Sequence, residues 1–451
     1  MRETNSTRPL ARVGGMPKVA GGLVLGALPE LLRDQFKALR RWQQDYGGVF
    51  EVNIGAMSFV VAADANTASE MMIERHRAFA RGGALYEPVQ RLLGQQSLLT
   101  SEGDHWRGRR RAAQPHFRQQ AVAMMTERIS RTLTEVLDTL QPGPCDIDEV
   151  TGRISMAVAL RVMFSESSKE ARFETLAHAL DDAIARIAFG WVSARLPRWL
   201  PLPGRARYRR SLATIDETVE WLVERRRASG EFGDDFLGML LHMAEGGDMT
   251  TQDIRDEAVT LIVAGYETIA TAMAWAFYEL ACHPEILARA QAEADAFARG
   301  ELAEVTDLRF TTQVFKEALR KYPSTIWLPR NAAEDSELAG YPVKAGTAVL
   351  CSPYLVHHDP HAWDEPERFD PERFAEGSAQ PRNRFAFMPF GLGPHMCVGL
   401  HLAMLEGPLA IARLLQRWTL APIPGREPSP KISTTMSNKD GIWLELSART
   451  P

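Results

Sequence analysis

The chain has only four cysteines among its 451 residues, Cys145, Cys282, Cys351 and Cys397, and no two are close in sequence. This scarcity excludes a local CxxC redox pair, a zinc site built from neighbouring cysteines, and a CxxCH site for covalent c-type haem. Scattered thiols are typical of a reducing compartment. We therefore expect a cytoplasmic protein.

The chain also lacks an excess of positive charge and a long apolar run. Its formal net charge is −5, which argues against nucleic-acid binding. The apolar stretch Val19–Leu32 is short and carries Glu30, whereas a membrane span needs roughly 20 apolar residues. We predict no signal peptide and no membrane anchor, and an irregular lead-in over residues 1–30.

The rest of the composition is that of a globular protein. Apolar residues make up 45% of the chain and charged residues 24%, enough to bury a large core and an apolar cofactor. There is no internal repeat of solenoid length. We predict one domain over residues 1–451, mainly α-helical with a small β region.

Hydrophobic periodicity and breaker residues place the elements. The longest predicted helix runs from Thr250, an N-cap with Asp253 three residues on, to His283 before Pro284. At 1.5 Å per residue it would be a central rod of roughly 50 Å. Other helices are expected at 34–46, over most of 66–163, at 172–188, 208–228 and 400–417, and in a segment that ends near residue 322. Strands are expected at 49–54, 58–62, 325–330, 347–351 and 442–446.

The strongest chemical signal is the decapeptide FGLGPHMCVG at 390–399. Gly391 and Gly393 would let the backbone turn tightly and approach a flat cofactor. A helix is predicted to start after Gly399, and the positive end of its dipole would favour the thiolate of Cys397, the form that binds iron. The alternative for a lone cysteine is a buried free thiol in a glycine-containing loop.

This decapeptide resembles the haem-binding loop of the cytochrome P450 family, FxxGxxxCxG. The resemblance extends from residue 34 to the C-terminal strands. It implies the cytochrome P450 fold, with haem b between the long central helix and the Cys-loop helix. It also implies that Cys397 is the axial thiolate, which favours O–O cleavage, and that Phe390, Gly391 and Gly399 lie at the haem.

Four further segments match the family in order and spacing, the first being AGYET at 264–268 in the longest helix. A glycine inside a helix costs about 1 kcal/mol relative to alanine, which makes sense if a ligand approaches Ala264 and Gly265. The segment resembles the oxygen-activating motif, in which Thr268 would bind the oxygen ligand and Glu267 would relay protons. Alternatively, Glu267 lies at the surface and Thr268 inside the helix.

The second segment places Glu317 and Arg320 three residues apart on one helix face. It resembles the family's ExxR pair, which meets an arginine of a later loop and has a structural role. We assign Arg373 as this third partner. The letters PERF occur twice, so the register is ambiguous by five residues and Arg368 is the alternative.

The remaining two segments would bind the haem propionates, which need cationic or hydrogen-bonding partners. Trp106 and Arg110 resemble the WxxxR contact, and Arg330 resembles the strand arginine of the family. His395 stands where many relatives have arginine, and it can donate the same hydrogen bond. Alternatively, Arg110 and Arg330 are solvated. Arg107, Arg109 and Arg111 could instead help an acidic redox partner to dock.

By the same resemblance, Ile326, Trp327, Leu328 and Tyr86 would line the substrate pocket, as would parts of 86–99, 187–191 and 434–436. An apolar stripe is, however, more often core than pocket. The nearby histidines His357, His358 and His361 allow a metal site by number. No convergent carboxylate or cysteine pattern supports one.

The resemblance predicts a monooxygenase that inserts one oxygen atom from O₂ into an apolar small molecule such as a lipid, terpenoid or polyketide. No flavin, nicotinamide or Cys-rich ferredoxin segment is apparent. We therefore expect electrons from a separate ferredoxin or flavodoxin and its NAD(P)H reductase, acting on a monomer. The alternatives are a peroxygenase or isomerase, and a haem sensor without enzymatic activity.

Overall fold

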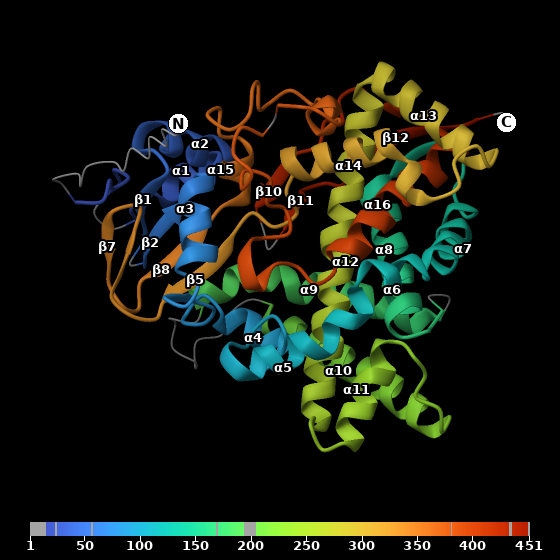
Figure 1. Cartoon of the computed structure of the whole chain (residues 1–451), viewed down its shortest axis with the longest axis horizontal. Coiled ribbons are helices and arrows are strands. Elements are labelled where there is room, and N and C mark those ends of the chain that lie inside the picture. Colours follow the sequence, from blue (N-terminus) through green and yellow to red (C-terminus); the bar gives the residue numbers. More distant parts are fainter. Residues whose placement is uncertain are drawn as a thin grey trace, which may run out of the picture.

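The computed structural model describes residues 15–22, 25–55, 57–167, 170–193, 204–379, 381–432 and 435–449, without the side chains of 188–193 and 432. Most helices lie on one side of the molecule and the largest sheet on the other (Figure 1). The helix α12 (Thr251–Cys282) runs through the helical part and packs along α8 (Ile147–Met163). The mainly helical fold with small sheets agrees with the prediction.

The ends of α12 form as the sequence predicts. The Thr250 hydroxyl accepts a hydrogen bond from the Asp253 N–H, and the Asp253 carboxylate accepts one from the Thr250 N–H. This capping box satisfies N–H groups that the helix itself cannot use. The next helix, α13 (Pro284–Ala298), starts at the proline that stops α12. Although α12 is long and apolar enough to cross a membrane, 72% of its most apolar window is buried inside this fold.

Most of the predicted helices form, but the helices at Leu28–Arg33, Phe236–Glu245 and Pro353–His357 were not predicted. The amphipathic faces of the helices form one large core. Their bounds are α1 Leu28–Arg33, α2 Gln35–Tyr46, α3 Ala65–Ser69, α4 Glu87–Leu93, α5 Gly103–Ala113, α6 Gln119–Ala123, α7 Thr126–Leu137, α9 Ala171–Ser193, α10 Arg205–Ala228, α11 Phe236–Glu245, α14 Arg309–Lys321, α15 Pro353–His357 and α16 Leu400–Leu415. A π-helical turn at Glu70–Glu74 follows α3, and 3₁₀ turns occur at Gln114–Phe117, Val305–Asp307, Pro371–Phe374 and Gly393–His395.

The largest sheet has five strands in the order β1-β2-β8-β5-β3. These are β1 Val49–Ile54, β2 Met57–Ala62, β8 Ala348–Cys351, β5 Leu328–Ala332 and β3 Phe79–Ala80. Strand β2 pairs in parallel with β8, so the sheet joins segments that are far apart in the sequence. The strand predicted at 325–330 begins three residues later in the structure.

Three smaller sheets complete the β region. Strands β4 (Gly143–Asp146) and β9 (Trp418–Pro422) flank β12 (Trp443–Ala448), and β6 (Ser336–Leu338) pairs with β7 (Tyr341–Val343). The hairpin of β10 (Pro430–Ile432) and β11 (Met436–Asn438) lies against α12, because the indole N–H of Trp275 donates to the Met436 carbonyl at 3.0 Å. This hairpin and α16 bring C-terminal residues to the middle of α12.

Candidate active site

The loop before Cys397 owes its shape to two glycines. Gly391 and Gly393 have φ values of 73° and 71°, which favour glycine. A Cβ atom on Gly393 would lie 2.1 Å from the carbonyl oxygen of Met72 in the π-helical turn. The loop closes where the Cys397 N–H donates to the Phe390 carbonyl at 2.8 Å. The tight turn forms as predicted, but the close approach that requires Gly393 is to the protein's own backbone.

The sulfur of Cys397 lies just before the first turn of α16. Gly399 is the N-cap of that helix, and a Cβ atom on it would lie 3.8 Å from the sulfur. Burial raises the pKa of the Cys397 thiol, while the Gly399 N–H and the positive charge of Arg110 oppose that rise. The helix end thus favours thiolate as predicted, but desolvation outweighs it. A bound metal ion deprotonates such a thiol outright, so this sulfur fits an iron site.

A surplus of positive charge surrounds one side of this loop. Arg81 interacts electrostatically with Arg110 and Arg330, and His395 interacts with Arg81 and Arg330. Glu102 is an acidic partner of both Arg81 and His395. The His395 Nε2 atom lies 3.2 Å from a Glu102 carboxylate oxygen. Burial, together with the positive charges of Arg330 and Arg110, lowers the pKa of Arg81 to about 10, while Glu102 opposes the shift. One carboxylate does not balance these cations.

Two nitrogen atoms in this cluster are buried without a hydrogen-bond partner, the Arg81 Nε donor and His395 Nδ1. The Trp106 ring packs on the His395 ring, with 4.1 Å between their centroids. Buried unpaired donors beside excess positive charge are costly, and an anion such as the two carboxylates of haem would satisfy them. The residues therefore fit the propionate side of haem.

Arg81 is a residue that the sequence reasoning missed. It begins the Gly-rich segment Arg81-Gly82-Gly83, where the helical pattern expected over most of 66–163 is broken. Its Nη1 donates to the Leu98 carbonyl at 2.9 Å, and its backbone N–H donates to Glu102 at 2.7 Å. A lone arginine beside two glycines was the available signal, but no motif marked it.

Arg330 lies in β5 beside Tyr86. Its Nη1 donates to the Pro329 carbonyl at 2.7 Å and lies 3.4 Å from the Tyr86 hydroxyl. The Tyr86 hydroxyl also donates to Pro329 at 3.3 Å. Arg330 is buried and therefore not the solvated arginine that was the alternative. Tyr86, which was predicted to face the substrate, is buried with its hydroxyl at the cationic cluster.

The acid–alcohol pair lies in the middle of α12. The Thr268 hydroxyl donates to the Ala264 carbonyl at 2.7 Å, as a helical threonine commonly does. The Glu267 carboxylate accepts a hydrogen bond from the Thr435 hydroxyl at 2.7 Å. Burial raises the pKa of Glu267 to about 7, and the negative charge of Asp181 adds to the rise. Glu267 can therefore hold or release a proton near neutral pH, and it is not the surface glutamate of the alternative.

Gly265 lies where α12 packs against α8. A Cβ atom on it would lie 3.0 Å from the Met163 Cε atom and 3.8 Å from the Ala159 Cβ atom, both on α8. The glycine thus allows α12 and α8 to pack closely. Ala264, one residue earlier, has an exposed side chain. The approach of a ligand to Ala264 and Gly265 stays a prediction.

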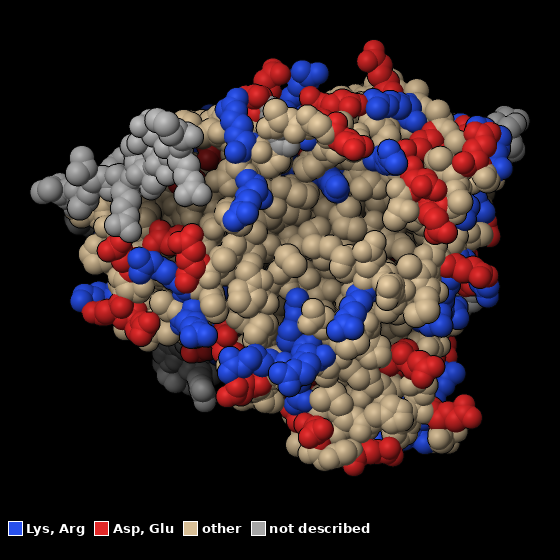
Figure 2. Space-filling view, in the orientation of Figure 1, with Lys and Arg blue, Asp and Glu red and all other residues tan. Residues whose placement is uncertain are grey.

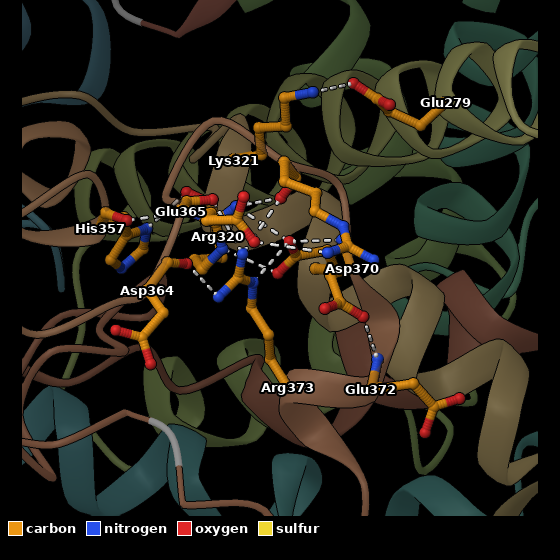
Figure 3. Close-up of polar contacts among 11 residues, drawn as sticks. Glu279, Arg320, Lys321, His357, Asp364, Glu365, Asp370, Glu372 and Arg373 are labelled. Atoms are coloured by element: carbon orange, nitrogen blue, oxygen red, sulfur yellow. Dashed lines mark hydrogen bonds and ion pairs between the residues drawn. The ribbon is translucent and has the colours of Figure 1, made fainter. Parts of the chain in front are cut away.

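Glu317, Arg320 and Arg373 meet in a buried cluster. Arg320 donates to the two Glu317 carboxylate oxygens at 2.7 and 2.9 Å, and Arg373 Nε lies 3.3 Å from Glu317 Oε1. The Asp370 N–H donates to the same oxygen at 2.9 Å. Figure 3 shows Arg320 and Arg373 converging, while Lys321 points away to Glu279. Arg320 also binds the His357 carbonyl at 2.9 Å, so the cluster ties α14 to the following loop.

The alternative partner, Arg368, lies outside this cluster as a side chain. It is exposed and pairs with Glu365 at 3.3 Å, while only its backbone carbonyl faces the cluster. The structure therefore places Arg373 rather than Arg368 against Glu317.

Arg109 does not have the exposed position that docking to a redox partner needs. It is buried, and its Nη2 lies 2.9 Å from an Asp253 oxygen of α12, with Glu257 also close. The docking prediction is therefore wrong for Arg109, whose charge stabilises the start of α12. Arg107 and Arg111 are exposed.

The three histidines near residue 360 do not converge on a metal position. His357 Nδ1 contacts the Arg320 carbonyl at 3.0 Å, and its Nε2 accepts from the Met388 N–H at 2.9 Å. Burial lowers the pKa of His357 to about 3, so it stays neutral. His358 is buried and bonded to Tyr354, and His361 is exposed. The described residues contain no group of three or more metal-ligating side chains.

The predicted pocket residues separate into two groups. Ile326 is fully buried in the core formed with α2, so packing rather than substrate contact accounts for it. Trp327 is half-buried against the same core, and Leu328 Cδ1 lies 3.8 Å from the Cβ position of Gly391 in the cysteine loop. Ile187 is buried in the main core. The side chains of 188–191 and residue 434 lie outside the described part of the chain.

Comparison with known proteins agrees with this geometry. The Cytochrome P450 family model matches residues 17–444. The crystal structure of the cytochrome P450DA heme domain superposes with a TM-score of 0.83 over 97% of this chain and 98% of that chain, at 24% identity. The chain therefore belongs to the cytochrome P450 family and has its fold.

Two bacterial relatives match across most of their length. Cyclooctat-9-en-7-ol 5-monooxygenase of Streptomyces melanosporofaciens is 33% identical over 84% of each chain. Pentalenene oxygenase of Streptomyces avermitilis is 29% identical over 90% of this chain and 91% of the relative. The protein is a cytochrome P450 monooxygenase, which carries haem with a cysteine thiolate ligand and uses O₂ and redox partners.

Proposed function

We propose that this enzyme oxygenates a cyclic terpenoid, that Cys397 holds its haem iron, and that Glu267 and Thr268 deliver protons. The observation that carries the residue assignment is the cysteine loop itself. Its sulfur lies at the start of α16, and the cationic cluster near this loop includes Arg81 Nε, which is buried without a hydrogen-bond partner. Of the four cysteines, we assign the iron to Cys397 because it lies in the glycine-containing loop directly before α16.

Separate residues of the chain would bind the haem and transfer protons. Arg81, Arg110, Arg330 and His395 would bind the two propionates and so fix the orientation of the haem plane. Bound haem supplies the reductive activation of O₂. Glu267 exchanges a proton near neutral pH because burial raises its pKa to about 7. The Thr268 hydroxyl, one residue on, would pass that proton toward the cofactor side of α12.

Replacing Cys397 tests the central assignment. Cys397→Ala should abolish the red-shifted band of the reduced carbon-monoxide complex, because that band depends on thiolate ligation. Cys351→Ala is the matched control, since Cys351 is buried in β8 and should leave the band intact. A red-shifted band in Cys397→Ala protein would refute the assignment.

The terpenoid class is supported by the names of the two bacterial relatives, cyclooctat-9-en-7-ol 5-monooxygenase and pentalenene oxygenase. Ligand titrations monitored at the Soret band would test it, using cyclic terpene hydrocarbons and alcohols beside fatty acids and aromatic polyketides of similar size. We expect spectral shifts at micromolar concentration for terpenes alone. Stronger shifts and NAD(P)H-dependent products with fatty acids or polyketides would refute the terpenoid class.

We further propose that a ferredoxin delivers the electrons. Lys and Arg side chains gather over the region of α4 and α5 (Figure 2), where Arg91, Arg107 and Arg111 are exposed. Such a patch attracts an acidic partner and accelerates its association at low salt. Arg107→Glu with Arg111→Glu should slow reduction by ferredoxin about tenfold at low ionic strength. Arg227→Glu on α10 is the control, and equal rates in all three proteins would place the docking surface elsewhere.

The presence of Glu267 beside Thr268 favours a monooxygenase that uses external electrons over a peroxygenase or isomerase. The discriminating measurement is turnover with peroxide alone against turnover with NAD(P)H and a redox partner. We expect product mainly in the second reaction. The same measurement tests the haem-sensor alternative, for which no ligand would support product formation in either reaction.

A further inference from the structure

Both residues of the acid–alcohol pair are connected by hydrogen bonds to the β10–β11 hairpin. The Thr435 hydroxyl, just before β11, donates to the Glu267 carboxylate at 2.7 Å. The next residue, Met436, donates its N–H to the Ser324 carbonyl at 3.0 Å. The Ser324 hydroxyl in turn donates to the Thr268 carbonyl at 2.6 Å. One segment of the hairpin is thus bonded directly to Glu267 and through Ser324 to Thr268.

The hairpin is held firmly where it makes these contacts. The Trp275 indole N–H donates to the Met436 carbonyl, and Met436 is buried. Thr435 is itself 3% exposed. A buried hydroxyl on a fixed backbone has few orientations available, so its hydrogen bond restricts the carboxylate more than an exposed one would.

Glu267 has few other restraints. Among the described residues no cation lies within ion-pair distance of it, and Thr435 makes the hydrogen bond to its carboxylate. The charged groups that influence it are Asp181 of α9, which accepts from Tyr266 at 3.1 Å, and Lys431 of β10. A glutamate side chain with several free torsions would lose its direction without the Thr435 contact.

We propose that Thr435 is a positioning residue that orients the Glu267 carboxylate for proton transfer, and that the β10–β11 hairpin therefore controls how many electrons end in product rather than in peroxide. The inference rests on the proposed role of Glu267. Thr435 touches neither the cofactor loop nor Thr268 in the contacts described above, and it acts through the acid.

The test compares Thr435→Val, which removes the hydroxyl at similar volume, with Thr435→Ser, which keeps it. Thr271→Val is the matched control, because the Thr271 hydroxyl bonds the backbone carbonyl of Glu267 at 2.9 Å instead of its carboxylate. Thr435→Ala gives a second hydroxyl-free variant if the valine protein does not fold. Wild-type melting temperature and carbon-monoxide spectrum establish that each holoenzyme is intact.

The first readout is the infrared carboxyl band of Glu267 in the resting ferric holoenzyme, assigned by its loss in Glu267→Gln and titrated against pH. The Thr435 hydroxyl and Lys431 lower the pKa of Glu267, and Asp181 raises it. Thr435→Val and Lys431→Met should therefore raise the midpoint and Asp181→Asn should lower it. Thr435→Ser and Thr271→Val should leave it near the wild-type value.

The second readout is product formed per NAD(P)H consumed. We expect a roughly tenfold loss in Thr435→Val, with the missing electrons recovered as peroxide, and near-complete rescue in Thr435→Ser. An unchanged titration in Thr435→Val, or a loss equal to that of Thr271→Val, would overturn the positioning role. If the proposed role of Glu267 is wrong instead, Glu267→Gln will keep the wild-type yield. In that case Thr435→Val will still shift the infrared titration of the Glu267 carboxyl group.

Discussion

One buried and one half-buried glutamate of this enzyme have opposite surroundings. Glu317 lies between two guanidinium groups and accepts a backbone N–H as well, so both of its oxygens are bonded. Glu267 has one hydroxyl partner and a nearby negative charge, and burial raises its pKa to about 7. The first environment bonds both carboxylate oxygens, whereas the second allows Glu267 to gain and lose a proton near neutral pH.

The contrast shows how one residue type serves structure or chemistry. A carboxylate bonded on every side cannot release its partners without a large cost, and this suits a joint between α14 and the loop that follows α15. A carboxyl group with a pKa near the working pH can give up its proton at little cost. The following experiments test that difference, beginning with the largest expected effect.

Removing Glu317 should have the largest consequence. Glu317→Ala leaves the guanidinium groups of Arg320 and Arg373 buried without their counter-charge, which costs roughly 3–5 kcal/mol for a broken buried pair. We expect little or no folded haem protein, measured as haem per polypeptide and as urea unfolding. Normal haem content and stability would mean that the cluster is not the structural joint described here.

Glu267→Gln should leave folding intact and reduce chemistry. The change removes a proton donor but keeps side-chain volume, and general acid–base groups contribute about 10²-fold or more. We expect a loss of product formation of about this size with an unchanged melting temperature. In the wild type, yield per NAD(P)H should fall as pH rises through about 7, where Glu267 loses its proton; the glutamine variant should show no such step.

Glu406 extends the comparison to a buried carboxyl group in α16. Burial holds the pKa of Glu406 well above its usual value, and its Oε1 atom has no hydrogen-bond partner. Because the folded pKa is raised, its contribution to stability is present at acid pH and is lost as pH rises above the unfolded value near 4.5. Glu406→Gln should therefore stabilise the enzyme by about 1–2 kcal/mol at pH 8, and less at pH 5, in thermal unfolding experiments.

The smallest effect is expected at Arg368. Its exposed ion pair with Glu365 is of a kind worth about 0–1 kcal/mol. Arg368→Ala should therefore change the free energy of unfolding by less than about 0.5 kcal/mol, in contrast to Arg373→Ala. Similar losses in both variants would contradict the assignment of Arg373 to the cluster.

Local signals in the sequence predicted most of the framework. Thr250 with Asp253, and Pro284, set the ends of α12 because caps and breakers act within one turn. The resemblance of short motifs to those of the cytochrome P450 family led to Cys397, Glu267 and the pair of Glu317 and Arg320.

The residues that were missed or misjudged depend on contacts distant in sequence. Arg81 meets His395, Thr435 meets Glu267, and Arg109 meets Asp253 only after the chain has folded. No spacing rule links such positions. The contact of Gly265 with Met163 could not be predicted for the same reason, because Met163 belongs to a helix about a hundred residues earlier.

The parallel pairing of β2 with β8 also has a consequence for biosynthesis. Phe59 pairs with Ala348, and at about 5–20 residues per second the ribosome adds the second strand many seconds after the first. Until then β2, with its apolar run Phe59–Val61, has an open edge of the kind that promotes aggregation. Chaperone supply and translation speed should therefore limit the yield of soluble enzyme in a host cell.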